Sequence, residues 1–70
     1  MSAEDRFVAA AMSCGEYLES DLRATWRASH RQRHRVELAQ LYARRSVRED
    51  LTIEQRLGAA QAVAVLLEVA

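Results

Sequence analysis

The chain has 70 residues, among them ten Arg, no Lys, ten acidic residues, one Cys and no Pro, and its formal net charge is zero. A single Cys excludes an intrachain disulfide, and a chain this small buries only about 60% of its unfolded surface, so we expect one marginally stable domain over 1–70. The acidic start and the short apolar run at 62–67 are unlike a signal peptide or a span of about 20 residues, so we expect a cytoplasmic protein without a membrane segment.

The charges are unevenly distributed along the chain. Residues 1–22 carry one Arg and five acidic residues, a balance of −4, whereas residues 23–48 carry eight Arg and Glu37, a balance of +7. Residues 49–70 carry Arg56 and four acidic residues, a balance of −3. The basic middle stretch favours partners that bear carboxylates or phosphates, because the guanidinium fork of Arg pairs with both groups.

Helix-forming residues dominate the chain and no alternating run indicates a strand, so we predict an all-α fold. The first predicted helix covers about 3–28, with Ser2 at the N-cap. Its apolar stripe consists of Phe7, Ala11, Cys14, Leu18, Leu22 and Trp26. Gly15 disfavours a helix interior by about 1 kcal/mol, and Ser13 with Glu16 has the spacing of a second capping box. The segment is therefore one long helix or two pieces divided near residue 14.

The second predicted helix covers about 33–47. The apolar stripe of the first helix fails at residues 29–33, where Ser29 and Gln32 have the spacing of a capping box, so we favour a break in the chain there. A continuous helix is the alternative, because no Gly or Pro interrupts residues 16–57.

The third predicted helix covers about 52–69 and has the clearest beginning. Thr52 and Gln55 have the spacing of a capping box, and Glu54 suits the positive end of the helix dipole. Apolar side chains surround nearly the whole helix, which indicates burial on more than one side. We therefore predict a small three-helix bundle that is completed by homodimerisation through this helix, with a monomeric bundle around it as the alternative. The predicted dimer interface consists of Leu57, Ala60, Val63, Ala64, Leu66 and Leu67.

The Arg-rich middle of the chain is the predicted contact surface for a partner. Arg side chains recur there every four residues, which places them on one slowly turning helix stripe. Such a stripe is either a solvated face or a binding surface whose charges set specificity, with Tyr42 as the aromatic anchor. The predicted partner-binding residues are Arg27, Arg31, Arg35, Tyr42, Arg44, Arg45 and Arg48.

Nucleic acid is the alternative partner of this stretch. Eight Arg within residues 23–48 attract phosphates, and the ring of Trp26 offers a stacking surface for a base. Trp26 continues the apolar stripe, however, so we place it in the core, and a zero net charge is not typical of a nucleic-acid-binding domain. Residues 38–47 match a helix-turn-helix only weakly, because the turn position lacks Gly.

No group of residues indicates catalysis or a cofactor. His30 and His34 lie four residues apart, but further zinc ligands are missing beside them and neighbouring Arg side chains disfavour a cation. Cys14 lies on the apolar stripe, so we predict a buried small side chain. We therefore predict a non-catalytic helical regulator, adaptor or inhibitor that binds a protein partner, a class that includes phage-encoded proteins. A small dimeric nucleic-acid-binding regulator is the alternative.

Overall fold

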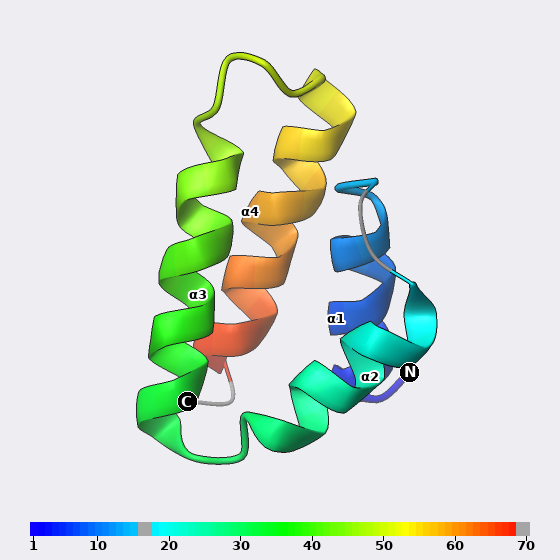
Figure 1. The fold of residues 1–70 in the computed structure, drawn as a ribbon, viewed down its shortest axis with the longest axis vertical. Coiled ribbons are helices and arrows are strands. Elements are labelled where there is room, and N and C mark those ends of the chain that lie inside the picture. Colours follow the sequence, from blue (N-terminus) through cyan, green and yellow to red (C-terminus); the bar gives the residue numbers. More distant parts are fainter. Residues whose placement is uncertain (16–17, 69–70) are drawn as a thin grey trace.

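The computed structural model describes residues 1–15 and 18–68, and in these ranges it contains four helices and no strand (Figure 1). The helices are α1 (Ala3–Met12), α2 (Glu19–Ala28), α3 (Gln32–Ser46) and α4 (Ile53–Glu68). The all-α prediction is confirmed. The three-helix count is wrong, because the stretch predicted as one helix over 3–28 holds α1 and α2, and the alternative of two pieces divided near residue 14 is confirmed. The expected capping role of Glu16 and the predicted helix end at residue 69 lie outside the described residues.

Helix α1 ends in a tight hydrogen-bonded turn, after which the backbone takes a left-handed conformation at Gly15. The N–H groups of Cys14 and Gly15 donate to the carbonyls of Ala11 and Met12, and Gly15 has a φ of +85°. This left-handed conformation strains residues that carry a Cβ, and Gly adopts it freely at helix ends. Gly15 therefore ends the first helical segment instead of lying inside a longer helix.

The break predicted near residue 30 is confirmed, but its expected capping box is not formed. The buried Ser29 ends α2, and its hydroxyl donates to the carbonyl of Thr25, 2.9 Å away. Arg31 instead occupies the N-cap position of α3 and provides no side-chain cap. The Ser29 side chain therefore serves the end of α2 and not the start of α3.

The other two predicted helix starts agree with the structure. The Thr52 hydroxyl accepts from the N–H of Gln55 at 3.1 Å, and the Gln55 side chain accepts from the N–H of Thr52 at 2.9 Å. At the other end of the chain, Ser2 accepts from the N–H of Asp5 at 3.1 Å. Both pairs satisfy donor groups that the first turn of a helix leaves free.

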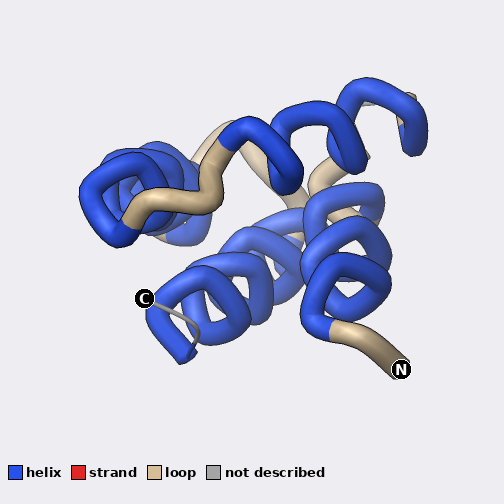
Figure 2. The backbone as a smooth tube through the Cα atoms, turned by 90° about the horizontal axis from the view of Figure 1, so that it is seen from below, coloured by secondary structure: helices blue, strands red, loops and turns tan. Residues whose placement is uncertain are grey.

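Helix α4 is the centre of the bundle. It packs between α3, which runs antiparallel to it, and α1, while α2 packs on α1 (Figure 1). Seen from below, α2 lies on one side of this layer, and no helix of the described residues covers α4 on the opposite side (Figure 2). Helix α4 therefore has a packed side and an open side.

Aromatic rings from three helices meet in the core. The ring of Phe7 lies 5.2 Å from Trp26 and 5.7 Å from Tyr42, and the latter pair is edge-to-face. Offset and edge-to-face pairs of this kind are the favoured arrangements of aromatic rings. Trp26 is buried, as its position on the apolar stripe predicts.

Small residues of α4 serve the packing of this chain on itself. A Cβ at Gly58 would lie 2.7 Å from the carbonyl oxygen of Ala10 and 2.7 Å from the Cβ of Ser13. Helices α1 and α4 can approach this closely only because residue 58 has no side chain. Ala59 and Ala62 are also fully buried. These small residues are therefore not available to a second copy.

Candidate protein interface

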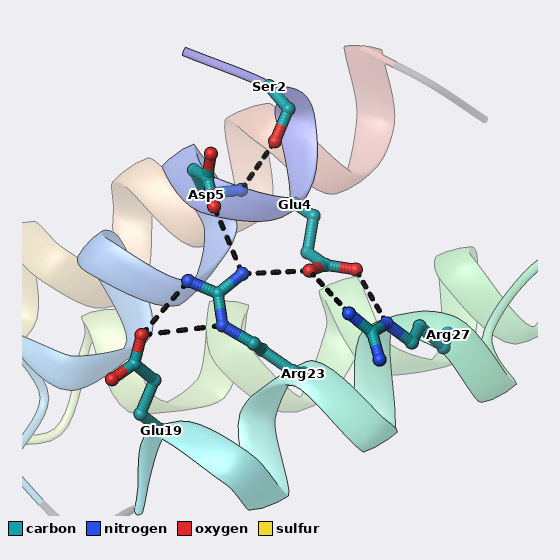
Figure 3. Close-up of polar contacts among 6 residues, drawn as sticks. All are labelled: Ser2, Glu4, Asp5, Glu19, Arg23 and Arg27. Atoms are coloured by element: carbon teal, nitrogen blue, oxygen red, sulfur yellow. Dashed lines mark hydrogen bonds and ion pairs between the residues drawn. The ribbon is translucent and has the colours of Figure 1, made fainter.

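The acidic start of the chain pairs with the first two Arg of the basic stretch 23–48 (Figure 3). Arg23 of α2 donates to Glu4 at 2.7 Å and to Asp5 at 3.0 Å, both on α1, and to Glu19 at 2.9 Å. Arg27 donates to the second oxygen of Glu4 at 3.1 Å. Hydrogen bonds from Arg27 and Arg23 hold the pKa of Glu4 below its usual value, and those from Arg23 and Ser2 do the same for Asp5. The −4 and +7 segments of the sequence thus partly neutralise each other within the molecule.

Several other predicted contact residues also have partners inside the chain. The guanidinium of Arg35 stacks over the ring of Trp26 at 4.0 Å, and that of Arg45 lies 5.4 Å from the ring of Tyr42. Arg48 makes a two-pronged ion pair with Asp50, which lowers the pKa of Asp50. Arg side chains held by planar partners support the fold and offer less to a second molecule.

Two of the predicted Arg residues stay available. Arg31, at the turn between α2 and α3, and Arg44, near the end of α3, are exposed and make no ion pair within 1–15 and 18–68. They lie towards opposite ends of α3, about 20 Å apart at 1.5 Å per residue. The structure therefore does not bring the seven predicted residues together into one patch.

The prediction that Tyr42 anchors a partner needs correction. Its side chain is 1% exposed and packs edge-on against Phe7. Burial raises the pKa of Tyr42 to about 12. In the sequence, the neighbouring Arg residues suggested an exposed position for Tyr42. Its side chain instead points towards the core, where Leu38 and Ala39 of the same helix also pack.

The open side of α4 carries a continuous apolar stripe. It consists of Ile53, Leu57, Ala60, Ala64 and Leu67, all exposed. The three large side chains are 74%, 58% and 54% exposed in chain order. Four members of the predicted dimer interface lie on this stripe. Of the other two, Val63 is half-buried, and Leu66 is 0% exposed, so Leu66 belongs to the core and its assignment needs correction.

Helix α3 extends this apolar surface. Val36, Ala43 and Val47 follow one line along α3 or directly after it, and two shallow hollows separate this line from the α4 stripe. The hollow near the α3–α4 loop is lined by Ser46, Ile53, Arg56, Leu57 and Ala60. The hollow at the far end is lined by Val36, Ala39, Gln40, Ala43, Val63 and Leu67. The stripe, the line and the hollows together are called the α3–α4 face below.

Sequence reasoning missed Ile53 and Val47, which are 74% and 69% exposed. Ile53 lies in the first turn of α4, and Val47 follows the last turn of α3, so neither was assigned to the interface. The signal that finds Ile53 is the alternating spacing of four and three residues from 53 to 67, which defines a seam along one side of a helix.

The residues with potential for chemistry are not assembled into a site in the described part of the chain. His30 and His34 are exposed, and no cluster of three metal-binding side chains occurs within 1–15 and 18–68. Cys14 is buried and donates to the carbonyl of Gln55 at 3.4 Å. No helix in these ranges has the length and apolar character of a membrane span. Comparison with protein-family models, with curated proteins and with solved structures finds no match.

Proposed function

We propose that the protein is a non-catalytic protein-binding module that acts as a homodimer. The α3–α4 face is the contact surface between copies, and exposed Arg side chains outside it meet a further protein partner. Regulator, adaptor and inhibitor are the roles that suit such a module, and a cytoplasmic location stays a prediction.

The observation that carries this proposal is the exposed stripe from Ile53 to Leu67. Single exposed apolar side chains are ordinary on a protein surface, but a contiguous apolar patch marks an interaction surface or an aggregation hazard. The stripe runs along one side of α4. Apolar side chains of a partner can insert into the two hollows beside it. Shape and apolar character together are typical of the core of a protein interface.

Arg31 supports the proposed contact with a further partner. It is exposed at the α2–α3 turn and has no carboxylate partner in the described chain. Arg is enriched in protein interfaces because its planar fork pairs with carboxylates in two parallel hydrogen bonds.

Nucleic acid is the second candidate, and the ion pairs weigh against it. Arg23, Arg27, Arg33 and Arg48 each bind a carboxylate of this chain, so a phosphate would have to compete for them. Trp26 is buried and covered by the Arg35 guanidinium, so its ring is not open to a base.

The test combines the mass in solution with capture of partners. Light scattering from about 1 µM to about 1 mM brackets the range in which weak complexes dissociate. We expect the wild type to reach twice the mass of one chain, and Leu57→Glu to stay monomeric, because a carboxylate would be buried in the middle of the face. Gln61→Glu adds the same charge beside the stripe and is expected to leave the dimer intact.

Immobilised protein then tests the further partner. We expect a protein from the source cells that binds the wild type and is lost on Arg31→Glu. A wild type that stays monomeric at every concentration, with no partner that depends on Arg31, would contradict the proposed function. Binding to an oligonucleotide pool that falls steeply between about 50 and 200 mM salt would favour the nucleic-acid candidate instead.

A further inference from the structure

We propose that the two copies pack face to face with their α4 helices parallel, so that α4 of each copy lies over α3 of the other. The two-fold axis then runs along the helices. This inference rests on the proposed homodimer, and it assigns the residues that set the orientation of the copies.

The stripe on α4 has the geometry of a self-complementary seam. Its residues are separated by four, three, four and three positions, the spacing at which one side of a helix repeatedly meets a neighbouring helix. From Ile53 to Leu67 the seam is about 21 Å long at 1.5 Å per residue, against a longest molecular axis of 30 Å. Because Ala60 and Ala64 have small side chains, another helix can approach the middle of the seam closely.

The size of the face suits a second copy. A specific interface buries about 800 Å² on each partner. The accessible surface of this chain is 4492 Å², so a dimer would cover somewhat less than one fifth of it. Helices α3 and α4 together form one long side of the four-helix structure, which is a surface of this order.

The two edges of the face carry opposite charge. The period of 3.6 residues per turn places Arg33, Glu37 and Arg44 on the outer edge of α3, away from α4. The 3.6-residue period places Glu54, Gln61 and Glu68 on the outer edge of α4, where Arg6 of α1 binds Glu68 at 2.7 Å. On the α3 edge two Arg stand against Glu37, and on the α4 edge two carboxylates stand against Arg6, so the α3 edge is net basic and the α4 edge is net acidic.

Charge selects between the two possible two-fold arrangements. An axis across the helices would place α3 over α3 and α4 over α4, which brings edges of like charge together. An axis along the helices places the basic α3 edge of one copy beside the acidic α4 edge of the other, twice. Opposite charges along the edges of an interface favour an arrangement, and like charges there disfavour it.

Arg44 and Glu54 form the decisive pair. Both are exposed, and neither makes an ion pair in the described part of the chain. The Arg56 side chain donates to the carbonyl of Ser46 at 3.1 Å, so these two residues lie within one side-chain length of each other. Arg44 lies two residues before Ser46, and Glu54 two residues before Arg56, so they differ by about 6 Å along the axis, within reach of two long side chains.

A parallel dimer also joins the two basic ends. The turns between α2 and α3 then lie at the same end of the assembly, and each contributes an exposed Arg31. A surface for an acidic protein partner would thus be built from both copies and would be incomplete in the monomer. The α3–α4 loops, with Glu49 and Asp50, would share the opposite end.

The test is a charge exchange between two variants, measured by sedimentation velocity at low salt. Arg44→Glu alone and Glu54→Arg alone each create two like-charge pairs in the proposed dimer, so we expect each to raise the dissociation constant about tenfold or more. In a dimer of one variant with the other, both contacts between positions 44 and 54 again join an acidic to a basic side chain. The mixture should therefore regain wild-type association. Arg31→Glu, the same charge change outside the face, should leave the dissociation constant unchanged.

Spin labels give a second readout. In a Cys14→Ala background, a label at Arg31→Cys should show a distance well below the 30 Å length of the molecule, because both turns lie at one end. A dimer whose two variants do not rescue each other, or whose labels lie at opposite ends, would overturn the parallel arrangement and leave the proposed homodimer standing. A wild type that never dimerises would remove both.

Discussion

The α1–α2 junction, where Glu4 and Asp5 meet Arg23 and Arg27, and the α3–α4 face differ in what their side chains contact. At the junction, charged groups from the acidic and basic stretches bind each other, with Arg23 held by three carboxylates. On the α3–α4 face, apolar side chains of a size that normally fills a core point outwards, and Leu57 is 58% exposed. Many Arg side chains of the basic stretch thus bind carboxylates or aromatic rings of the same chain, while apolar side chains of α4 stay exposed.

This contrast moves the search for a binding surface away from the most conspicuous residues. A run of Arg is easy to see in a sequence, but its availability depends on the acidic residues that the fold places beside it. An apolar helix is equally visible, but only the packing of its neighbours determines which of its sides stays open. The substitutions below test this division, from the largest expected effect on stability to the smallest.

Tyr42→Ala is expected to have the largest effect. Removing a buried aromatic ring costs about 3–5 kcal/mol, a large share of the roughly 5–15 kcal/mol that stabilises a typical domain. Urea unfolding followed by circular dichroism measures this loss. Leu57→Ala, on the open face, should change the stability of the monomer by less than about 0.5 kcal/mol. Equal losses at the two positions would remove the distinction between core and face.

Gly58→Ala is expected to be the next most harmful change. The new Cβ would lie 2.7 Å from the backbone oxygen of Ala10, so α1 and α4 must move apart. Overpacking of this kind costs about 1–3 kcal/mol, and the better helix propensity of Ala offsets up to about 1 kcal/mol of it. A shift of the urea midpoint to lower concentration would show the net loss, with Gln61→Ala as the exposed control. A variant more stable than the wild type would show that the two helices are not in close contact.

Arg35→Ala tests the stacking of an Arg that the sequence assigned to a partner. Its guanidinium covers Trp26, and its Nη1 atom is buried without a hydrogen-bond partner. Losing the stacking and the packing of the side-chain stem should cost about 1 kcal/mol. Arg31→Ala, at the exposed turn, should be neutral within about 0.5 kcal/mol. Trp26 fluorescence, which responds to solvent at the ring, reports the change; an unaltered spectrum together with unaltered stability would contradict the stacking.

Acid should weaken the α1–α2 junction. The pKa of Glu4 in the folded chain lies below its usual 4.5 because Arg27 and Arg23 donate hydrogen bonds to the carboxylate. The resulting stabilisation is complete above the usual pKa and is lost as the pH falls through the folded pKa. Glu4→Gln should therefore show a smaller difference in unfolding free energy between neutral and acid pH than the wild type. Glu49→Gln, which changes a carboxylate without an ion pair in the described chain, should keep the wild-type pH dependence.

Local signals in the sequence predicted much of the fold. The reciprocal pair of Thr52 and Gln55 set the start of α4, and the failure of the apolar stripe near residue 30 marked the end of α2. The break after α1 stayed an alternative, because a Gly within an apolar repeat costs too little to decide between a helix interior and a left-handed cap. Only the backbone of Gly15 settles it.

The candidate interface was less predictable, because it depends on contacts between distant segments. Leu57 and Leu66 look alike in a helix that is apolar on nearly every side, and the packing of α1 and α3 alone distinguishes the exposed one from the buried one. The charge pattern could not predict that Tyr42 is buried, because its ring packs against Phe7, which lies 35 residues away in the chain. Likewise, the pairing of Glu4 with Arg23 follows from the approach of α1 and α2, which local spacing does not encode.

The most direct test of the central claim is the mass of the wild type by sedimentation equilibrium, beside Leu57→Glu, over a concentration series. The α3–α4 face predicts a reversible monomer–dimer equilibrium for the wild type and a monomer of unchanged helix content for Leu57→Glu. A wild type that remains monomeric up to about 1 mM, or a variant that dimerises equally well, would contradict the assignment of this face as an interface.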